Sequence, residues 1–169
     1  MAYGFAGIWA ATGTDDPRAT LERMRELVRR DVVYPFVVQQ ATDIVRAAAP
    51  RDQLEQASAI RDWIAMHFRF IPDIRDVELL RSPGWQIQVI QRDGIVQGDC
   101  DDAAMLGAAL GLAVGIPAVF EARAYLNPKN PYQHVVTILS TRRGPFELDT
   151  TRPNGLEPPA VAKTLRVRV

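Results

Sequence analysis

The spacing of apolar residues changes at Gly98, and this change constrains the fold more than any other feature of the chain. Before Gly98, apolar residues recur every three or four positions, which is the spacing of amphipathic helices. After it come an Ala- and Leu-rich stretch and then short segments rich in β-branched and aromatic residues, separated by polar turns. Helices followed by an antiparallel sheet predict an α+β fold.

Three helices are predicted in the first half. Asp16-Pro17 is typical of an N-cap followed by proline at the first helical position, and this helix is broken or kinked by Pro35. Continued periodicity predicts a second helix over 37–48 and a third over 52–70.

Between Ser82 and Thr150 the sequence predicts a turn with a loop, then one helix and three strands. Ser82-Pro83-Gly84 indicates a turn, and the residues from there to Gly98 are expected to form a loop with a weak strand or a short helix. A helix over 100–114 follows, which is capped by Gly115. The strands are expected at 117–125, 134–140 and 145–150, joined by two hairpin loops.

The length of 169 residues suits one domain. The apolar N-terminal segment lacks a preceding basic region and is too short to span a bilayer, so an edge strand or a docking arm is expected instead of a signal peptide. The Pro-rich tail ends in an alternating pattern that predicts one short strand. The single domain is then divided into an arm (1–16), a mainly helical part (17–97), a catalytic-type core (98–151) and a tail (152–169).

Charge and cysteine content exclude several classes of function. The chain has 20 basic and 20 acidic residues, and its formal net charge of zero argues against nucleic-acid or membrane partners. Arg23, Arg25, Arg29 and Arg30 alternate with acidic residues, which indicates a solvated helix face. The single cysteine, Cys100, excludes an intramolecular disulfide and a multi-cysteine zinc site.

Cys100 is either a buried thiol or a reactive one, and its surroundings favour the second. It is expected in the first turn of a helix, where free N–H groups and the helix dipole stabilise a thiolate. His134 is expected to open a strand and Asp149 to end the next, which makes them neighbours across a hairpin. A thiol, an imidazole and a carboxylate in this order predict a nucleophile, a general base and an orienting group.

The backbone around Cys100 and two glutamines complete the predicted site. Gly98 is expected to let the backbone turn sharply and approach a substrate. The N–H of Cys100 is one candidate donor to an oxyanion, and the side chains of Gln97 and Gln91 are candidates for a second.

Several motifs then resemble the transglutaminase-like cysteine peptidase superfamily. Its pattern is a G-x-C helix start, a G-I-P-A strand entry, a His-led strand and a strand ending in D-x-T. The matching segments are Gly98-Asp99-Cys100-Asp101-Asp102, Gly115-Ile116-Pro117-Ala118, His134-Val135-Val136 and Glu147-Leu148-Asp149-Thr150. The helical region upstream, with Phe70-Ile71-Pro72-Asp73 and Leu80-Arg81-Ser82-Pro83, is similar to versions found in tailed-phage and prophage genes.

The resemblance implies a papain-like core in which the helix that carries the nucleophile packs on an antiparallel sheet. It implies that Cys100, His134 and Asp149 are the catalytic residues of a hydrolase that cleaves an amide bond of a protein or peptide through an acyl-thioester. No cofactor and no metal are expected. The phage-like region places the protein in the cytoplasm of a bacterial host or in association with a virion.

The chain also departs from the family. Asp99 and Asp101 flank the cysteine where animal transglutaminases have Gln and Trp, which argues against protein cross-linking and favours the microbial, peptidase- or amidase-like branch. Thr150-Thr151 replaces the commoner D-P-T. Two alternatives stay open: a non-catalytic assembly module that docks onto phage structural proteins through its arm or tail, and an enzyme that transfers the acyl group to an amine.

Other polar and aromatic residues are expected to be structural. His67 lies near the apolar face of the third predicted helix and is interpreted as a partly buried core histidine, and Trp63 and Trp85 as core or cleft-wall aromatics. Asp99, Asp101 and Asp102 are suited to capping a helix, but their charges oppose ionisation of a neighbouring thiol. Their spacing lacks the alternating oxygens of a calcium loop.

Overall fold

The computed structural model of the chain describes residues 7–12, 16–73, 77–152 and 158–169. Within these residues the elements follow one another as β1 (Ile8–Thr12), α1 (Pro17–Asp31), α2 (Pro35–Val45), α3 (Gln53–His67), β2 (Phe68–Phe70), β3 (Val77–Arg81), α4 (Pro83–Asp93), β4 (Val96–Gly98), α5 (Cys100–Ala113), β5 (Ala118–Tyr125), β6 (His134–Thr141), β7 (Gly144–Leu148) and β8 (Val161–Arg168). The α+β class predicted from the sequence is confirmed.

The first three helices are confirmed, with shifted ends. Asp16 caps α1 by accepting the N–H of Arg18 at 2.9 Å. Pro35 is the first residue of α2 as well as a break after α1, because the φ of proline suits the first helical position. The third helix ends at His67 rather than continuing to residue 70, since Phe68–Phe70 extends as β2 and pairs in parallel with β4.

The prediction of a turn and loop after Ser82 was wrong, because α4 occupies Pro83–Asp93. Ser82 is its N-cap and Pro83 its first residue, so the dipeptide that indicated a turn starts a helix instead. Gly94 ends the helix in the left-handed conformation, at φ 81°. The buried carboxylate of Asp31 accepts the N–H of Gly84 at 2.8 Å and joins α4 to the end of α1.

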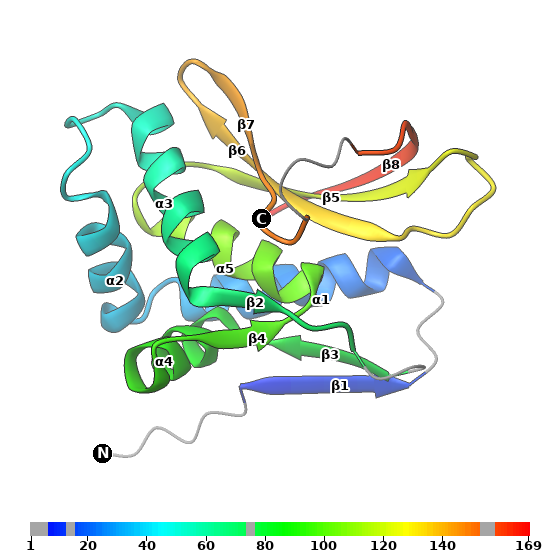
Figure 1. Cartoon of the computed structure of the whole chain (residues 1–169), viewed down its shortest axis with the longest axis horizontal. Helices are drawn as coiled ribbons and strands as arrows, with labels where there is room; N and C mark the ends of the chain where they lie inside the picture. The colour runs from blue at the N-terminus through cyan, green and yellow to red at the C-terminus, as the bar shows by residue number, and fades with distance from the viewer. Residues whose placement is uncertain (1–6, 13–15, 74–76, 153–157) are drawn as a thin grey trace.

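The second half builds the main sheet. The predicted strands β5, β6 and β7 are confirmed, and the predicted tail strand is β8, which pairs along β5. All neighbours are antiparallel, in the order β7-β6-β5-β8. Figure 1 shows this sheet above α5.

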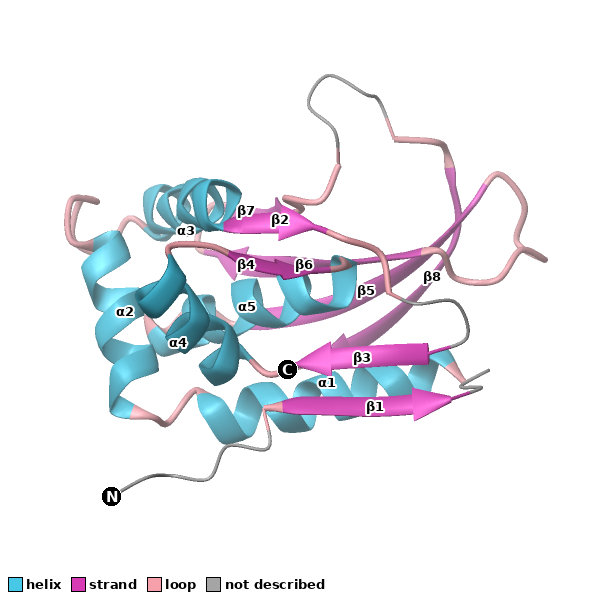
Figure 2. Ribbon diagram, turned by 60° about the horizontal axis from the view of Figure 1, so that its bottom comes forward, coloured by secondary structure: helices cyan, strands magenta, loops and turns pink. Residues whose placement is uncertain are grey.

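Helix α5 is the central element of the fold. It packs against the four-stranded sheet on one side and against α1 and α2, and it also contacts α3, which lies beside the sheet (Figures 1 and 2). Most of its residues are buried, which explains a sequence that is apolar on every face. Gly111 allows the close approach to β6, because a Cβ there would lie 2.5 Å from the Leu139 side chain.

The described parts of both end segments form strands that pair with other strands of the same chain. Strand β1 pairs antiparallel with β3, in agreement with the predicted N-terminal edge strand, and the two run beside α1 (Figure 2). Residues 1–6, 13–15 and 153–157 of the predicted arm and tail lie outside the described residues.

Candidate active site

Cys100 is the first residue of α5, as the sequence predicted. Asp99 is the N-cap, and its side chain accepts the N–H groups of Asp101 and Asp102. Asp102 reaches back to the N–H of Asp99 and completes a capping box. The sharp helix start therefore follows from the local sequence and holds the Cys100 side chain and its N–H at the end of the helix.

Gly98 has a different role from the predicted one. Its backbone is not left-handed, but a Cβ at this position would lie 2.4 Å from Asp102 Oδ2. Asp102 is fully buried, and it accepts the backbone N–H of Arg81 at 2.6 Å and its guanidinium at 2.5 Å. Gly98 thus makes room for a buried ion pair behind the helix start.

His134 and Asp149 meet across the β6–β7 hairpin. His134 is the first residue of β6, and Asp149 follows the last residue of β7. His134 Nε2 lies 2.7 Å from Asp149 Oδ2. Because a carboxylate only accepts, this contact assigns the proton to Nε2 and leaves the Nδ1 lone pair for a donor. Asp149 Oδ1 accepts the N–H and the hydroxyl of Thr151, so the threonine of the D-x-T motif orients the carboxylate.

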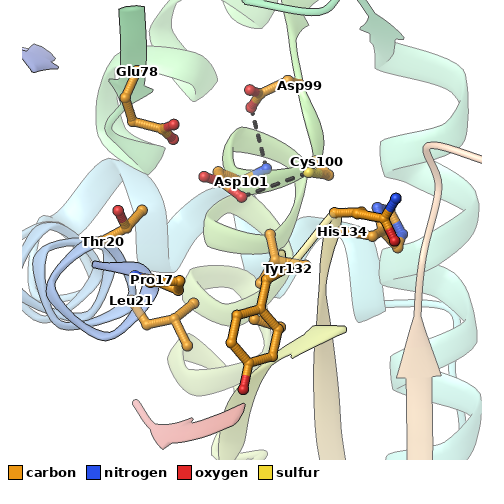
Figure 3. Close-up of a pocket in the computed structure, with 12 residues that line it drawn as sticks. Pro17, Thr20, Leu21, Glu78, Asp99, Cys100, Asp101, Tyr132 and His134 are labelled. Atoms are coloured by element: carbon orange, nitrogen blue, oxygen red, sulfur yellow. Dashed lines mark hydrogen bonds between the residues drawn. The ribbon is translucent and has the colours of Figure 1, made fainter. Parts of the chain in front are cut away.

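Cys100 and His134 line the same cavity, whose volume is about 240 Å³. Figure 3 shows the cysteine at the start of α5 with His134 beside it and Tyr132 below. The backbone N–H of Val135, the residue after His134, donates a hydrogen bond to the Cys100 sulfur. This contact ties the helix that carries the thiol to the strand that carries the imidazole.

Burial raises the pKa of the Cys100 thiol well above its usual value, and the negative charges of Asp101 and Asp99 raise it further. The thiol donates to Asp101 Oδ1 at 3.6 Å, whereas the Val135 N–H favours the thiolate. The expected stabilisation of a thiolate by the helix start is therefore outweighed, and the resting form of the residue is the protonated thiol.

The acidic residues around Cys100 extend beyond those that the sequence indicated. One carboxylate oxygen from each of Asp73, Glu78 and Asp99 lies within 4.8 Å of the other two, and these atoms are where a hard cation would find ligands. Burial, followed by the charges of Asp73 and Glu78, raises the pKa of Asp99 to about 6. Burial and a hydrogen bond with Glu78 raise the pKa of Asp101 well above its ordinary value.

Two solved structures are similar in fold to this chain. No protein-family model and no curated protein matches the chain. A proposed cysteine protease from Cytophaga hutchinsonii matches with a TM-score of 0.56 at 19% identity, over 93% of this chain and 53% of the other. A proposed protease from Parabacteroides distasonis also has a TM-score of 0.56, at 17% identity, over 78% of this chain and 26% of the other.

The chain has a cysteine peptidase-like fold. It spans about half the length of one of these proteins and about a quarter of the other. In the described part of the chain, no helix combines the length and the apolar character that crossing a membrane needs.

Neither glutamine predicted as an oxyanion donor lines the cavity of this cysteine peptidase-like fold. Gln91 is on α4 and donates to Gln40, and Gln97 lines a separate pocket with Trp85 and Val89. Both predictions were wrong, because α4 was not anticipated and β4 turns Gln97 away. Gln133, next to His134, is the glutamine of the cavity wall.

The structural interpretation of the other predicted residues is confirmed. His67 Nδ1 lies 2.8 Å from the carbonyl oxygen of Gly94, and its ring lies 4.8 Å from that of Trp63. Trp63 and Trp85 are partly buried against the core. Arg23 and Arg25 pair with acidic residues of the same helix, as expected for a solvated face.

Sequence reasoning did not identify Arg152, Tyr125 or Glu78 as neighbours of the site. Arg152 Nε lies 2.8 Å from Asp149 Oδ2, and Glu78 lines the cavity. Arg152 was assigned to the tail, and Glu78 lay between the third predicted helix and the turn at Ser82, where no helix or strand was predicted. The three come from separate elements, so no local motif connects them.

Proposed function

We propose that the protein is a cysteine hydrolase that cleaves an amide bond of a protein or peptide substrate. The observation that carries the proposal is the shared cavity of Cys100 and His134, together with the hydrogen bond that holds His134 Nε2 on Asp149. The fold similarity to proposed proteases supports it.

In the proposed reaction, His134 Nδ1 takes the thiol proton as the Cys100 sulfur attacks the substrate carbonyl carbon. The protonated thiol makes this transfer part of the attack, rather than a preceding ion-pair equilibrium. The backbone N–H of Cys100, at the open end of α5, faces the developing oxyanion. Collapse of the tetrahedral intermediate breaks the C–N bond, and the imidazolium returns its proton to the leaving amine.

Water then completes the cycle. It attacks the acyl-thioester while His134 accepts one of its protons, and the thiol leaves with that proton as the carboxylic acid is released. Asp149 keeps the imidazole in one tautomer and stabilises its charged form in both steps. Burial acts to raise the pKa of Asp149, but hydrogen bonds from His134 and Thr151 outweigh it and keep this pKa low, so that the carboxylate stays charged.

Alkylation of Cys100 by iodoacetamide tests the proposal without a known substrate. At pH 7–8 we expect His134→Ala to slow alkylation by about tenfold or more, because the variant lacks the base that removes the thiol proton. His67→Gln, which changes the other histidine, is the matched control and should alkylate like the wild type. Equal rates for His134→Ala and the wild type would show that His134 does not serve Cys100.

A peptide library incubated with wild type and Cys100→Ala, with and without an added primary amine, separates the remaining functions. Hydrolysed products that require Cys100 support the proposed reaction. Amine-capped products in place of free acids would replace it by acyl transfer. Absence of both, with the protein found in purified phage particles, would replace it by the assembly role.

A further inference from the structure

The side chain of Arg152 has its closest charged contact with the carboxylate that orients His134. Its Nε lies 2.8 Å from Asp149 Oδ2, the same oxygen that contacts His134 Nε2 at 2.7 Å. Its distance to Glu147 Oε1 is 3.9 Å, and Glu147 is bound by both terminal nitrogens of Arg123 at 3.0 and 2.7 Å. Asp149 is therefore the principal partner of Arg152.

Arg152 also holds an aromatic ring against the imidazole. Its NH2 group donates to the Tyr125 hydroxyl at 3.0 Å, and its guanidinium carbon lies 6.0 Å from the centre of the Tyr125 ring. That ring lies 6.4 Å from the His134 ring, with 30° between the planes. Tyr125 ends β5 at an irregularity in the pairing with β8. Arg152 thus contacts two separate groups that flank His134.

The three charged or titratable partners are well shielded. The exposed fractions of the side chains are 22% for Arg152, 8% for Asp149 and 13% for His134. An arginine is cationic across the accessible pH range, and its planar group fixes the direction of each N–H. A shielded cation that shares one carboxylate oxygen with an imidazole affects both the orientation of the carboxylate and the charge that the imidazole experiences.

We propose that Arg152 is a positioning residue that holds Asp149 and Tyr125 around His134 and so keeps the imidazole in its neutral, Nε2-protonated form. The inference rests on the proposed function. By sharing the Asp149 charge, Arg152 reduces the advantage of the imidazolium, so the Nδ1 lone pair stays available to accept the Cys100 proton. The other charged and titratable groups near His134 are Arg123, which is opposite it in the β5–β6 pairing and is bound to Glu147, and the cavity-lining residues Glu78, Asp99, Cys100, Asp101 and Tyr132. All of these are retained when Arg152 is substituted.

The test is an NMR titration of the histidine rings in wild type, Arg152→Gln, Arg152→Lys and Tyr125→Phe. The chain has two histidines, so His67 is an internal reference in every spectrum. We expect Arg152→Gln to move the midpoint of the His134 titration upward by about half a pH unit to one unit, because a cation has been removed. We also expect its ¹⁵N signature to shift toward a mixture of tautomers. Arg152→Lys retains the charge, so its His134 titration midpoint should lie close to that of the wild type.

Tyr125→Phe keeps every charge, so we expect a broadened tautomer signature with little movement of the midpoint. Arg92→Gln removes the exposed ion pair with Asp93 on α4 and is the control, which should leave the His134 midpoint unchanged. An unmoved or lowered His134 midpoint in Arg152→Gln overturns the inference. If Arg152→Gln does not fold, Arg152→Met replaces it, and an unmoved or lowered His134 midpoint in Arg152→Met, with a Tyr125→Phe tautomer signature identical to wild type, would overturn the inference as well.

The failure of this inference is distinguishable from failure of the proposed function. Equal alkylation of Cys100 in wild type and His134→Ala removes the proposed function, whatever the NMR result. A His134-dependent alkylation rate with an unmoved titration in Arg152→Gln removes only the role of Arg152.

Discussion

His134 Nε2 lies 2.7 Å from Asp149 Oδ2, although fifteen positions separate the two residues in the chain. The contact exists because β6 and β7 are antiparallel, so that the start of one strand lies beside the end of the other. The contact engages Nε2 and leaves Nδ1 outside it, and His134 and Cys100 line the same cavity. The acidic surroundings of that cysteine lead to the first two predictions.

Asp101→Asn should increase the reactivity of Cys100. Burial is the main reason for the raised thiol pKa, and the Asp101 charge is the next, so neutralising Asp101 favours the thiolate. We expect iodoacetamide to label the variant several-fold faster than the wild type at pH 8. Asp62→Asn, on the exposed side of α3, is the control and should label at the wild-type rate. Slower labelling of Asp101→Asn would mean that Asp101 assists thiol deprotonation instead of opposing it.

Asp99→Asn should change how the free energy of unfolding depends on pH. The pKa of Asp99 is raised from 3.8 to about 6, so the folded protein binds the proton more tightly than the unfolded chain. Wild-type stability should therefore fall, relative to the variant, as the pH rises from about 4 to about 6. Above pH 6 the free energy of unfolding of Asp99→Asn should exceed that of the wild type by on the order of 2–3 kcal/mol. Asparagine is also a good N-cap, so the substitution keeps the helix cap.

Urea denaturation at pH 4, 5, 6 and 7 measures this effect. Asp16→Asn makes the same change at the exposed cap of α1 and should show no comparable pH dependence relative to wild type. Parallel curves for wild type and Asp99→Asn would contradict the prediction.

Gly98→Ala should destabilise the fold by roughly 1–3 kcal/mol, because its Cβ would collide with the buried Asp102 carboxylate. Asp102 cannot easily move, since it is held by both the backbone and the side chain of Arg81. Gln97→Ala, at the exposed preceding position of β4, should change stability by less than about 0.5 kcal/mol. Chemical denaturation compares the two, and equal stabilities would show that the space beside Gly98 is not limiting.

Asp31→Ala should destabilise the contact between α1 and α4. The buried Asp31 carboxylate accepts the Gly84 N–H, and its loss leaves that N–H without an acceptor at a cost of about 1–3 kcal/mol. Asp43→Ala removes an exposed carboxylate of α2 and should be close to neutral. Thermal unfolding is the measurement, with a lower Tm expected for Asp31→Ala alone.

The order of helices and strands was predictable because each depends on local signals. The Asp16-Pro17 cap and the alternation of β5 to β7 are read directly from neighbouring residues. The helix start at Cys100 is of the same kind, because the aspartates that cap it are its immediate neighbours. Helix α4 was missed although Ser82-Pro83 and Gly94 indicate both of its ends, because serine followed by proline also begins turns.

The sequence by itself determined where Cys100, His134 and Asp149 stand in their elements. It did not determine the electrostatic state of the thiol or the partners of Asp149. Glu78 reaches Asp101 from β3, and Arg152 reaches Asp149 from beyond β7, through contacts that depend on how distant segments pack. Burial is also a property of the packed chain, and it reversed the expectation of a stabilised thiolate at the helix start. Charge interactions depend on distance and solvent exposure in space, so only the tertiary structure could decide them.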